Sequence, residues 1–277
     1  MVRLINNRKT RGAVNMALCF MAAVIGTFCA RPAQRTGEIP PVVNEKLRAV
    51  LTRAGIPEDI AKNIVSGENE FLSALSETLQ GDSYLRLLVD KQHPVSPLKY
   101  KPSDLVELTN YGAFRVSREG LLLRYPAAVA LEKMARAARE EGVTLLVSST
   151  WRSYEYQEEV YSRNVRQSGR ETADRESARP GYSQHQLGLA IDFGSITDAF
   201  AATGAGKWLA SHASEFGWSL SFPDGYESLT GYRWESWHYR YLGLPLTRLQ
   251  DAWFNGIQQY TLQFINEWEA WDAAPRQ

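Results

Sequence analysis

The sequence contains little cysteine, and the cysteine that it has lies near one end. Two cysteines, Cys19 and Cys29, occur among the 277 residues. The chain from Arg31 onward can therefore form no disulfide bond of its own, which excludes the class of small secreted domains that disulfides hold together. We expect this part of the chain to be stabilised by a hydrophobic core or by a metal ion.

Net charge is also absent, because 31 lysines and arginines balance 31 aspartates and glutamates. A protein that binds nucleic acid over much of its surface needs clustered positive charge, so this balance argues against nucleic acid as a partner. The charges are not spread evenly. Four basic residues and no acid precede residue 31, and acids outnumber bases by four in the remainder.

Long apolar runs are missing except for one, which covers residues 13–30 and follows the four basic residues Arg3, Arg8, Lys9 and Arg11. A basic segment followed by an apolar one and by small residues is typical of a secretory signal. Residues 1–30 therefore predict a signal peptide and an exported protein of the periplasm or cell envelope. About 18 apolar residues also approach the length that spans a bilayer. An uncleaved N-terminal anchor is the alternative, and it is the only membrane contact that we expect.

The rest of the chain divides into three predicted regions. Residues 31–90 read as a polar linker followed by a helical accessory region, because apolar residues recur there at helical spacing in two or three short runs. Three prolines in residues 91–102 predict an extended connector into a main domain, which we place at 91–245. Residues 246–277 form a tail with a broadly helical apolar pattern, and we expect one helix there that packs on the main domain.

The main domain contains one segment with an unusual alternation. Bulky apolar residues from Leu187 to Phe193 alternate with Gly188, Ala190 and Asp192, which predicts a strand with one bulky face and one nearly bare face. The bare face ends in the Asp192 carboxylate, and His185 stands just before the strand. An imidazole and a carboxylate that converge on a space are two of the three protein ligands that a catalytic zinc site needs.

A third ligand is available in the segment Trp234-Glu235-Ser236-Trp237-His238. His238 would complete the ligand set, and Glu235 would then lie nearby as a base for a metal-activated water. The two residues are three apart, so a turn or bulge must separate them. Taken singly, His185 could be a capped loop residue, Asp192 a strand-end cap and His238 a core histidine; together they predict a metal site. We do not expect His93, in the connector, or His212, in a helical segment, to be ligands.

Three blocks of residues resemble a known family. Ser149–Tyr154 with Gln157, then 178–192, then 230–243 are similar to the signature blocks of the VanY-type D-alanyl-D-alanine carboxypeptidases, which belong to the LAS group of zinc peptidases. The resemblance covers roughly residues 85–243 and implies that residues 91–245 are a zinc peptidase catalytic domain. It implies an α+β fold with a small antiparallel sheet flanked by helices, to which the sequence adds a short helical N-terminal region and a C-terminal helix.

The same resemblance implies roles for individual residues. One zinc ion would be held by His185, Asp192 and His238, with Glu235 as the catalytic base. Arg152 would steady the substrate carbonyl or carboxylate, its alternative being a surface salt bridge. Gln157 and Ser183 would contact the terminal D-alanine.

Three departures from the family pattern concern neighbouring positions. Ser236 stands where proline is frequent, and Trp151 where tyrosine is. Residues 221–223 read Ser-Phe-Pro instead of Arg-Tyr-Pro, which predicts that a charge and a hydroxyl are missing at the pocket rim.

The sequence therefore predicts an exported zinc carboxypeptidase that removes the C-terminal D-alanine from peptidoglycan stem peptides. The alternatives are an L,D-carboxypeptidase or a D-Ala-D-Ala dipeptidase of the same group, and a non-catalytic peptidoglycan-binding module. Glu235 and Arg152 argue against the last, because a purely structural zinc site needs neither.

Overall fold

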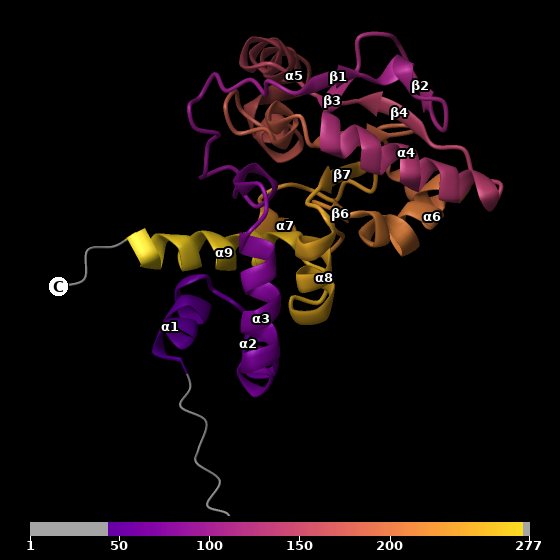
Figure 1. The fold of residues 1–277 in the computed structure, drawn as a ribbon. Coiled ribbons are helices and arrows are strands. Elements are labelled where there is room, and N and C mark those ends of the chain that lie inside the picture. The colour runs from indigo at the N-terminus through magenta and orange to yellow at the C-terminus, as the bar shows by residue number, and fades with distance from the viewer. Residues whose placement is uncertain (1–43, 274–277) are drawn as a thin grey trace, which may run out of the picture. The chain divides into compact units, whose positions relative to one another are not determined.

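The computed structural model describes residues 44–273 (Figure 1). The predicted signal peptide or anchor at 1–30, with both cysteines, and most of the predicted linker lie outside the described residues. Within 44–273, no helix has the length and apolar character needed to cross a membrane.

A five-stranded sheet forms the centre of the fold. Its central strands β4, β5 and β7 are neighbours, all paired antiparallel, and β6 extends this pattern at one edge. The other edge strand, β2, pairs parallel to β4, so the expected antiparallel sheet contains one parallel pair. A separate ribbon pairs β1 with β3. The strands are β1 (Leu105–Glu107), β2 (Arg115–Val116), β3 (Leu122–Arg124), β4 (Leu146–Ser149), β5 (Ala190–Phe193), β6 (Trp218–Leu220) and β7 (His238–Tyr241).

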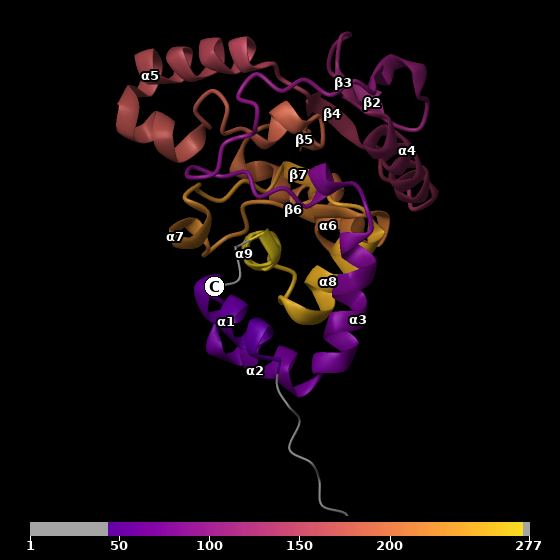
Figure 2. The same ribbon diagram turned by 60° about the vertical axis from the view of Figure 1, so that its left-hand side comes forward.

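Helices cover the sheet and leave one side of it available for a site. Helix α4 (Tyr125–Glu140) buries Leu131 and Met134 in a core that also contains Val147, Ile191 and Tyr239 of the sheet. In Figure 2, strands β4 and β5 lie between α4 and the long helix α5 (Tyr154–Glu176). The mixed α+β class expected from the sequence is confirmed.

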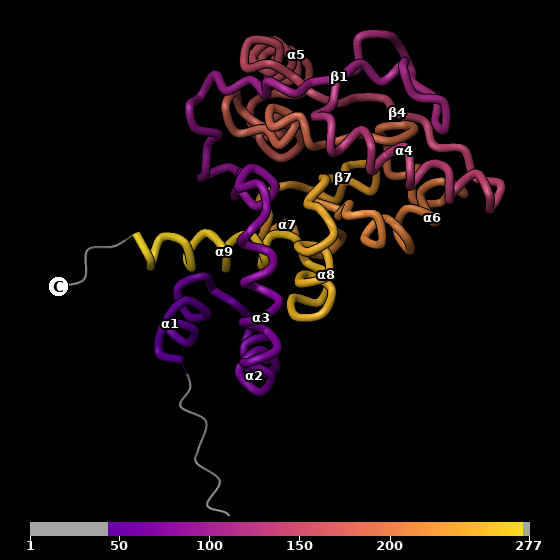
Figure 3. Tube along the Cα trace, viewed as in Figure 1, coloured from indigo at the N-terminus to yellow at the C-terminus, as the bar shows by residue number. Residues whose placement is uncertain are grey.

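The segments before and after the sheet share a second hydrophobic core. Helix α1 packs on α9 and helix α3 on α8 (Figure 3). The ring of Phe71 makes edge-to-face contacts with Trp253 and Phe264, with centroids 5.5 and 5.2 Å apart. The remaining helices are α1 (Glu45–Arg53), α2 (Glu58–Ser66), α3 (Glu68–Leu79), α6 (Gly204–His212), α7 (Glu227–Thr230), α8 (Leu244–Trp253) and α9 (Gln258–Ala273).

The tail forms two helices where the sequence suggested one. Asn255 and Gly256 have φ values of 52° and 73°, a left-handed conformation that ends a helix, and α9 starts in a new direction after them. Contacts join the described residues into one compact unit. The domain boundaries at 90 and 245 stay a prediction.

A buried arginine fastens the connector that follows α3 to the central sheet. Arg240 on β7 is fully buried, and its Nη2 donates hydrogen bonds to the carbonyl oxygens of Tyr84, Leu85 and Leu87 at 3.2, 3.2 and 2.8 Å. Burial lowers the pKa of Arg240 to about 9, so the side chain remains charged at neutral pH. The connector is therefore attached to β7 through a charged group that is paired with backbone carbonyls.

The shared core predicts the effect of a substitution far from the sheet. Phe71→Ala removes a fully buried ring that contacts both C-terminal helices, so we expect it to lower the free energy of unfolding by about 3–5 kcal/mol. Chemical denaturation of the full-length protein measures this. Ser76→Ala, at an exposed position of the same helix, should change stability by less than about 0.5 kcal/mol. Equal stability of the two variants would show that α3 contributes no core to the C-terminal helices.

Candidate metal centre and active site

The register of two neighbouring strands brings an acid and an imidazole together. Asp192 on β5 pairs directly with His238 on β7. Their sequence neighbours Ile191 and Tyr239 point into the core beneath α4, so Asp192 and His238 point to the opposite face. Asp192 Oδ1 lies 3.0 Å from His238 Nδ1. This agrees with the expected bare face that ends in a carboxylate.

His185 reaches the same place by a turn. The predicted strand was placed from Leu187, but residues Gln184–Leu187 form a single 3₁₀ turn and β5 begins only at Ala190. Gly188 between them has φ 67°, and a Cβ atom there would lie 3.0 Å from both Arg124 and Leu105. A glycine at this point lets the chain fold back, which carries His185 Nε2 to 3.2 Å from Asp192 Oδ2.

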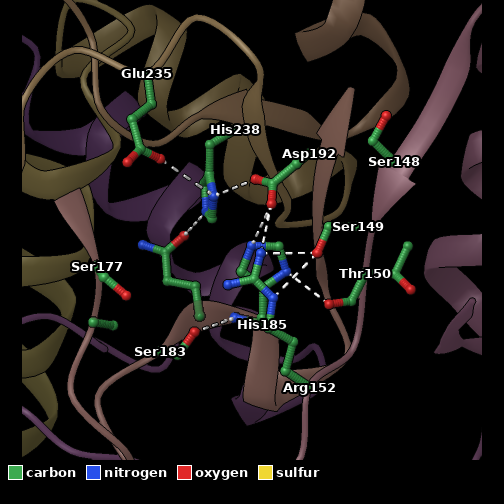
Figure 4. Close-up of polar contacts among 12 residues, drawn as sticks. Ser148, Ser149, Thr150, Arg152, Ser177, Ser183, His185, Asp192, Glu235 and His238 are labelled. Atoms are coloured by element: carbon green, nitrogen blue, oxygen red, sulfur yellow. Dashed lines mark hydrogen bonds and ion pairs between the residues drawn. The ribbon is translucent and has the colours of Figure 1, made fainter. Parts of the chain in front are cut away.

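Hydrogen bonds fix which nitrogen of each histidine faces Asp192. His185 Nδ1 donates to the carbonyl oxygen of Thr150 at 2.7 Å, so its Nε2 carries the free lone pair (Figure 4). His238 presents Nδ1 to Asp192, and its Nε2 lies 3.2 Å from Gln184 Oε1. Each imidazole thus has one nitrogen held by the protein and the other turned toward a common point.

The three residues form a group that fits a zinc ion. All are buried, and one potential ligand atom of each lies within 4.8 Å of the others; no other group of this kind occurs within residues 44–273. Ligand atoms around a tetrahedral zinc ion are about 3.3 Å apart, given Zn–N and Zn–O distances of about 2.0–2.1 Å. Each imidazole nitrogen lies near this distance from one carboxylate oxygen: His238 Nδ1 is 3.0 Å from Asp192 Oδ1, and His185 Nε2 is 3.2 Å from Asp192 Oδ2.

Electrostatics keep Asp192 and His185 in the protonation states that a metal requires. Burial favours the neutral form of Asp192, but the adjacent His185, His238 and Arg152 hold the pKa of its carboxyl well below the usual range. Burial, together with the charge of Arg152, lowers the pKa of His185 to about 4. An ionised carboxylate and a neutral imidazole are the forms that coordinate a metal.

Glu235 lies beside this group on the turn that the sequence required. His238 N donates to the carbonyl oxygen of Glu235 at 3.2 Å, and Glu235 N donates to that of Phe222 at 3.0 Å. The carboxylate oxygen Oε2 lies 3.7 Å from His238 Nδ1. Burial and then the negative charge of Asp192 raise the pKa of Glu235 well above its ordinary value. The side chain is thus a proton-binding group next to the ligand cluster.

Arg152 reaches the cluster from between β4 and α5, where Ser153 caps the helix by accepting from Tyr156 N. Its Nη2 donates to Asp192 Oδ2 at 2.7 Å and to Ser149 Oγ at 2.8 Å. Arg152 thus forms a salt bridge, as the alternative expected, but with a buried carboxylate and with its own side chain only 18% exposed. A fixed cation stands next to the ligands.

The two residues expected to contact substrate lie in different settings. Ser183 faces the cavity, and its Oγ accepts from His185 N at 3.3 Å. Gln157 is fully buried and does not line the cavity. Its Nε2 donates to the Ala178 carbonyl oxygen at 2.7 Å, and its Oε1 accepts from Arg152 Nη1 at 3.4 Å. In this structure Gln157 supports Arg152, and its direct contact with substrate stays a prediction.

A cavity of about 480 Å³ opens over the cluster and extends along α5. It contains the three candidate ligands, Arg152 and Glu235. Its other walls include Arg118, Tyr156, Arg163, Phe222, Tyr232 and Trp237.

The two departures at residues 221 and 222 lie in different settings. Ser221 is 2% exposed, does not line the cavity, and its Oγ donates to Gln184 Oε1 at 2.8 Å. Phe222 lines the cavity, and its ring packs on His238 with 4.9 Å between centroids.

Other residues complete the site or stay out of it. Sequence reasoning missed Ser149, Thr150 and Gln184, whose contacts orient Arg152, His185 and His238. Ser149 and Thr150 lie within the first resemblance block. Thr150 acts through its backbone carbonyl oxygen, which every amino acid has, so its residue type gives no sign of this role. Of the two other histidines, His93 pairs with Asp90 and His212 stacks on Trp208, and neither belongs to the metal group found within the described residues.

Comparison with known proteins gives matches over the same region. A profile of the VanY family, described as D-alanyl-D-alanine carboxypeptidase, matches residues 120–244. The putative carboxypeptidase YodJ of Bacillus subtilis is 36% identical over 182 residues, 63% of this chain and 66% of that protein. A D-alanyl-D-alanine carboxypeptidase of Enterococcus faecalis is 30% identical over 204 residues, 70% of each chain. The chain thus spans about two thirds of the length of these relatives.

Solved structures agree with the sequence matches. The LdcB LD-carboxypeptidase superposes with a TM-score of 0.57 at 33% identity, over 63% of this chain and 83% of that chain. A mutant of the D,D-pentapeptidase VanY, in complex with Zn(II), superposes with a TM-score of 0.54 at 27% identity, over 65% of this chain and 99% of that chain. The region matched by the profile contains Arg152, Glu235 and all three candidate metal ligands. Together with the sequence and structure matches, this shows that the chain belongs to the VanY family of D-alanyl-D-alanine carboxypeptidases.

Proposed function

We propose that this protein is an exported zinc carboxypeptidase that removes the C-terminal D-alanine from peptidoglycan stem peptides. The observation that carries the proposal is the buried cluster of His185, Asp192 and His238 with the Glu235 carboxylate 3.7 Å from His238 Nδ1. A structural zinc site needs no adjacent acid and no open cavity, whereas this cluster has both. Membership of the VanY family supports the same reaction.

The donor set suits one zinc ion, held by His185 Nε2, a carboxylate oxygen of Asp192 and His238 Nδ1. Bound zinc would lower the pKa of a water molecule to about 7, and its charge would offset the negative charge of Asp192 that raises the pKa of Glu235. The VanY neighbour that was solved in complex with Zn(II) supports the choice of metal.

Glu235 and Arg152 perform the remaining steps in this proposal. The Glu235 carboxylate accepts a proton from the attacking water and delivers it to the amine nitrogen of the departing D-alanine. Arg152 holds a negatively charged oxygen of the substrate, either the terminal carboxylate or the oxygen that becomes charged as the carbonyl is attacked. Its bonds to Ser149 and Asp192 keep the guanidinium in place before substrate arrives.

A second candidate is an L,D-carboxypeptidase, which cleaves after an L-centre and not between two D-alanines. The similarity to the LdcB LD-carboxypeptidase favours it, since that structure aligns at 33% identity. The two activities need the same zinc, base and arginine, and they differ in the pocket that holds the residue before the scissile bond.

Export to the periplasm or cell envelope is part of the proposal. Its support is the order of a basic segment and an apolar segment in residues 1–30 and the extracytoplasmic position of peptidoglycan as a substrate.

The assignment of the base predicts that Glu235→Gln separates metal binding from turnover. We expect the variant to retain about one equivalent of zinc and to lose activity by about 100- to 10,000-fold, because an amide cannot accept the proton. Metal analysis and a D-alanine release assay measure the two quantities. Glu171→Gln, at an exposed position of α5, is the control and should keep full activity. Full activity in Glu235→Gln, or wild-type protein without zinc, would refute the mechanism.

The proposed specificity predicts one product from stem peptides. Incubation with a stem pentapeptide should release free D-alanine and leave the tetrapeptide, as mass spectrometry would show. Turnover of the tetrapeptide alone would replace the proposal by an L,D-carboxypeptidase. Release of the intact D-Ala-D-Ala dipeptide would indicate a dipeptidase, and binding without any product a non-catalytic module.

The N-terminal segment predicts where the protein is found. Full-length protein with a C-terminal epitope should fractionate with the periplasm or envelope, whereas a variant without residues 2–30 should stay in the cytoplasm. Sequencing the N-terminus of the exported protein then distinguishes a cleaved signal from an anchor. Cytoplasmic recovery of the full-length protein would contradict export.

A further inference from the structure

A closed ring of hydrogen bonds lies directly behind the metal-ligand candidate His238. Ser221 Oγ donates to Gln184 Oε1 at 2.8 Å, Gln184 Nε2 donates to Gln258 Oε1 at 3.3 Å, and Gln258 Nε2 donates to Ser221 Oγ at 3.2 Å. All three side chains are at most 5% exposed. Gln184 Oε1 also faces His238 Nε2 at 3.2 Å, so the ring touches the imidazole on the side away from Asp192.

The direction of the ring is set by one backbone carbonyl. Two side-chain amides and a hydroxyl could donate around the ring in either direction, since each group both donates and accepts. The carbonyl oxygen of Ser219, 3.4 Å from Gln258 Nε2, can only accept. Gln258 must therefore turn its amide nitrogen toward Ser219 and its oxygen toward Gln184. Gln184 in turn must use its nitrogen toward Gln258, which leaves its oxygen toward His238.

The orientation of Gln184 decides whether the metal-bound form of His238 has a hydrogen-bond acceptor. When Nδ1, the atom that faces Asp192, binds a metal, the ring proton lies on Nε2, and an oxygen facing Nε2 accepts it. A reversed amide would turn its own hydrogen atoms toward that proton and would disfavour the metal-bound form. We propose that Gln258 is a positioning residue for the metal site: through Gln184 it keeps an acceptor in place for the Nε2 proton of metal-bound His238.

The proposal assigns a role to the C-terminal tail, which lies outside the stretch matched by the family profile. Gln258 is the first residue of α9, and its side chain is 1% exposed. The helix is held in place by the second core, through Phe264 and Leu262 among others. The other histidine ligand needs no such help, because His185 is oriented by a single bond to the Thr150 carbonyl.

Zinc affinity tests the proposal, which rests on the zinc site of the proposed function. Full-length metal-free protein is titrated with zinc against a chromogenic chelator. Gln258→Leu should weaken zinc binding by about 10- to 100-fold, the usual effect of losing a group that orients a ligand. In the proton spectrum of the zinc-loaded protein, the Nε2–H signal of His238 should lose in this variant the downfield shift of a hydrogen-bonded imidazole proton.

Gln259→Leu is the matched control. Gln259 is the next residue of α9, is 5% exposed, and donates to Asp90 Oδ2 at 2.8 Å, away from the ring. It should lower thermal stability to a similar degree and leave zinc affinity and the His238 spectrum as in the wild type. Equal zinc affinities in the two variants would overturn the proposal, whether both are weakened or both are unchanged.

Ser221→Ala keeps the question answerable if Gln258→Leu does not fold. It removes one hydroxyl from the ring and leaves the Gln258 to Gln184 bond in place, so zinc binding should weaken by less than 10-fold and the hydrogen-bonded Nε2–H signal of His238 should persist. Loss of that signal in Ser221→Ala would contradict control through Gln258. Wild-type protein that binds no zinc would refute the proposed function instead, and the two failures are thereby distinct.

Discussion

The site depends on the pairing register between β5 and β7. That register places Asp192 opposite His238 on the face of the sheet that α4 does not cover. A slip of one residue would turn one of the two side chains into the core, because successive residues of a strand point to opposite faces. The turn that carries His185, the turn that carries Glu235 and the position of Arg152 all bring groups to this one pair.

Asp192 is the residue that contacts Arg152 and both histidines of the site. It accepts from Arg152 and lies against both histidines, so a single buried carboxylate balances one permanent cation and faces two imidazole rings. Such a group would be costly to bury alone, and the hydrogen bonds around it keep it ionised. Burial and then this negative charge raise the pKa of Glu235, whereas the histidines and Arg152 lower that of Asp192, so the two acids in one cavity have opposite pKa shifts.

Much of the site, and less of the fold, could be predicted from the sequence. The ligand set followed from residue types that have few other uses at that spacing, and the turn before His238 followed from the three-residue separation. The 3₁₀ turn at residues 184–187 was missed because Leu187 and Leu189 continue the alternation of a strand, while the positive φ of Gly188 breaks it. The burial of Gln157 and Ser221 and the pairing of α1 with α9 depend on contacts distant in sequence, which local patterns do not contain.

Arg240 shows how one contact leaves part of the sequence free to vary. Its guanidinium is bonded to main-chain oxygens of residues 84, 85 and 87, and every amino acid supplies such an oxygen. Substitutions in this connector that keep its backbone path would preserve the attachment, whereas position 240 must supply a donor that reaches all three oxygens from a fully buried site. Among relatives, residues 84, 85 and 87 should therefore vary more freely than residue 240.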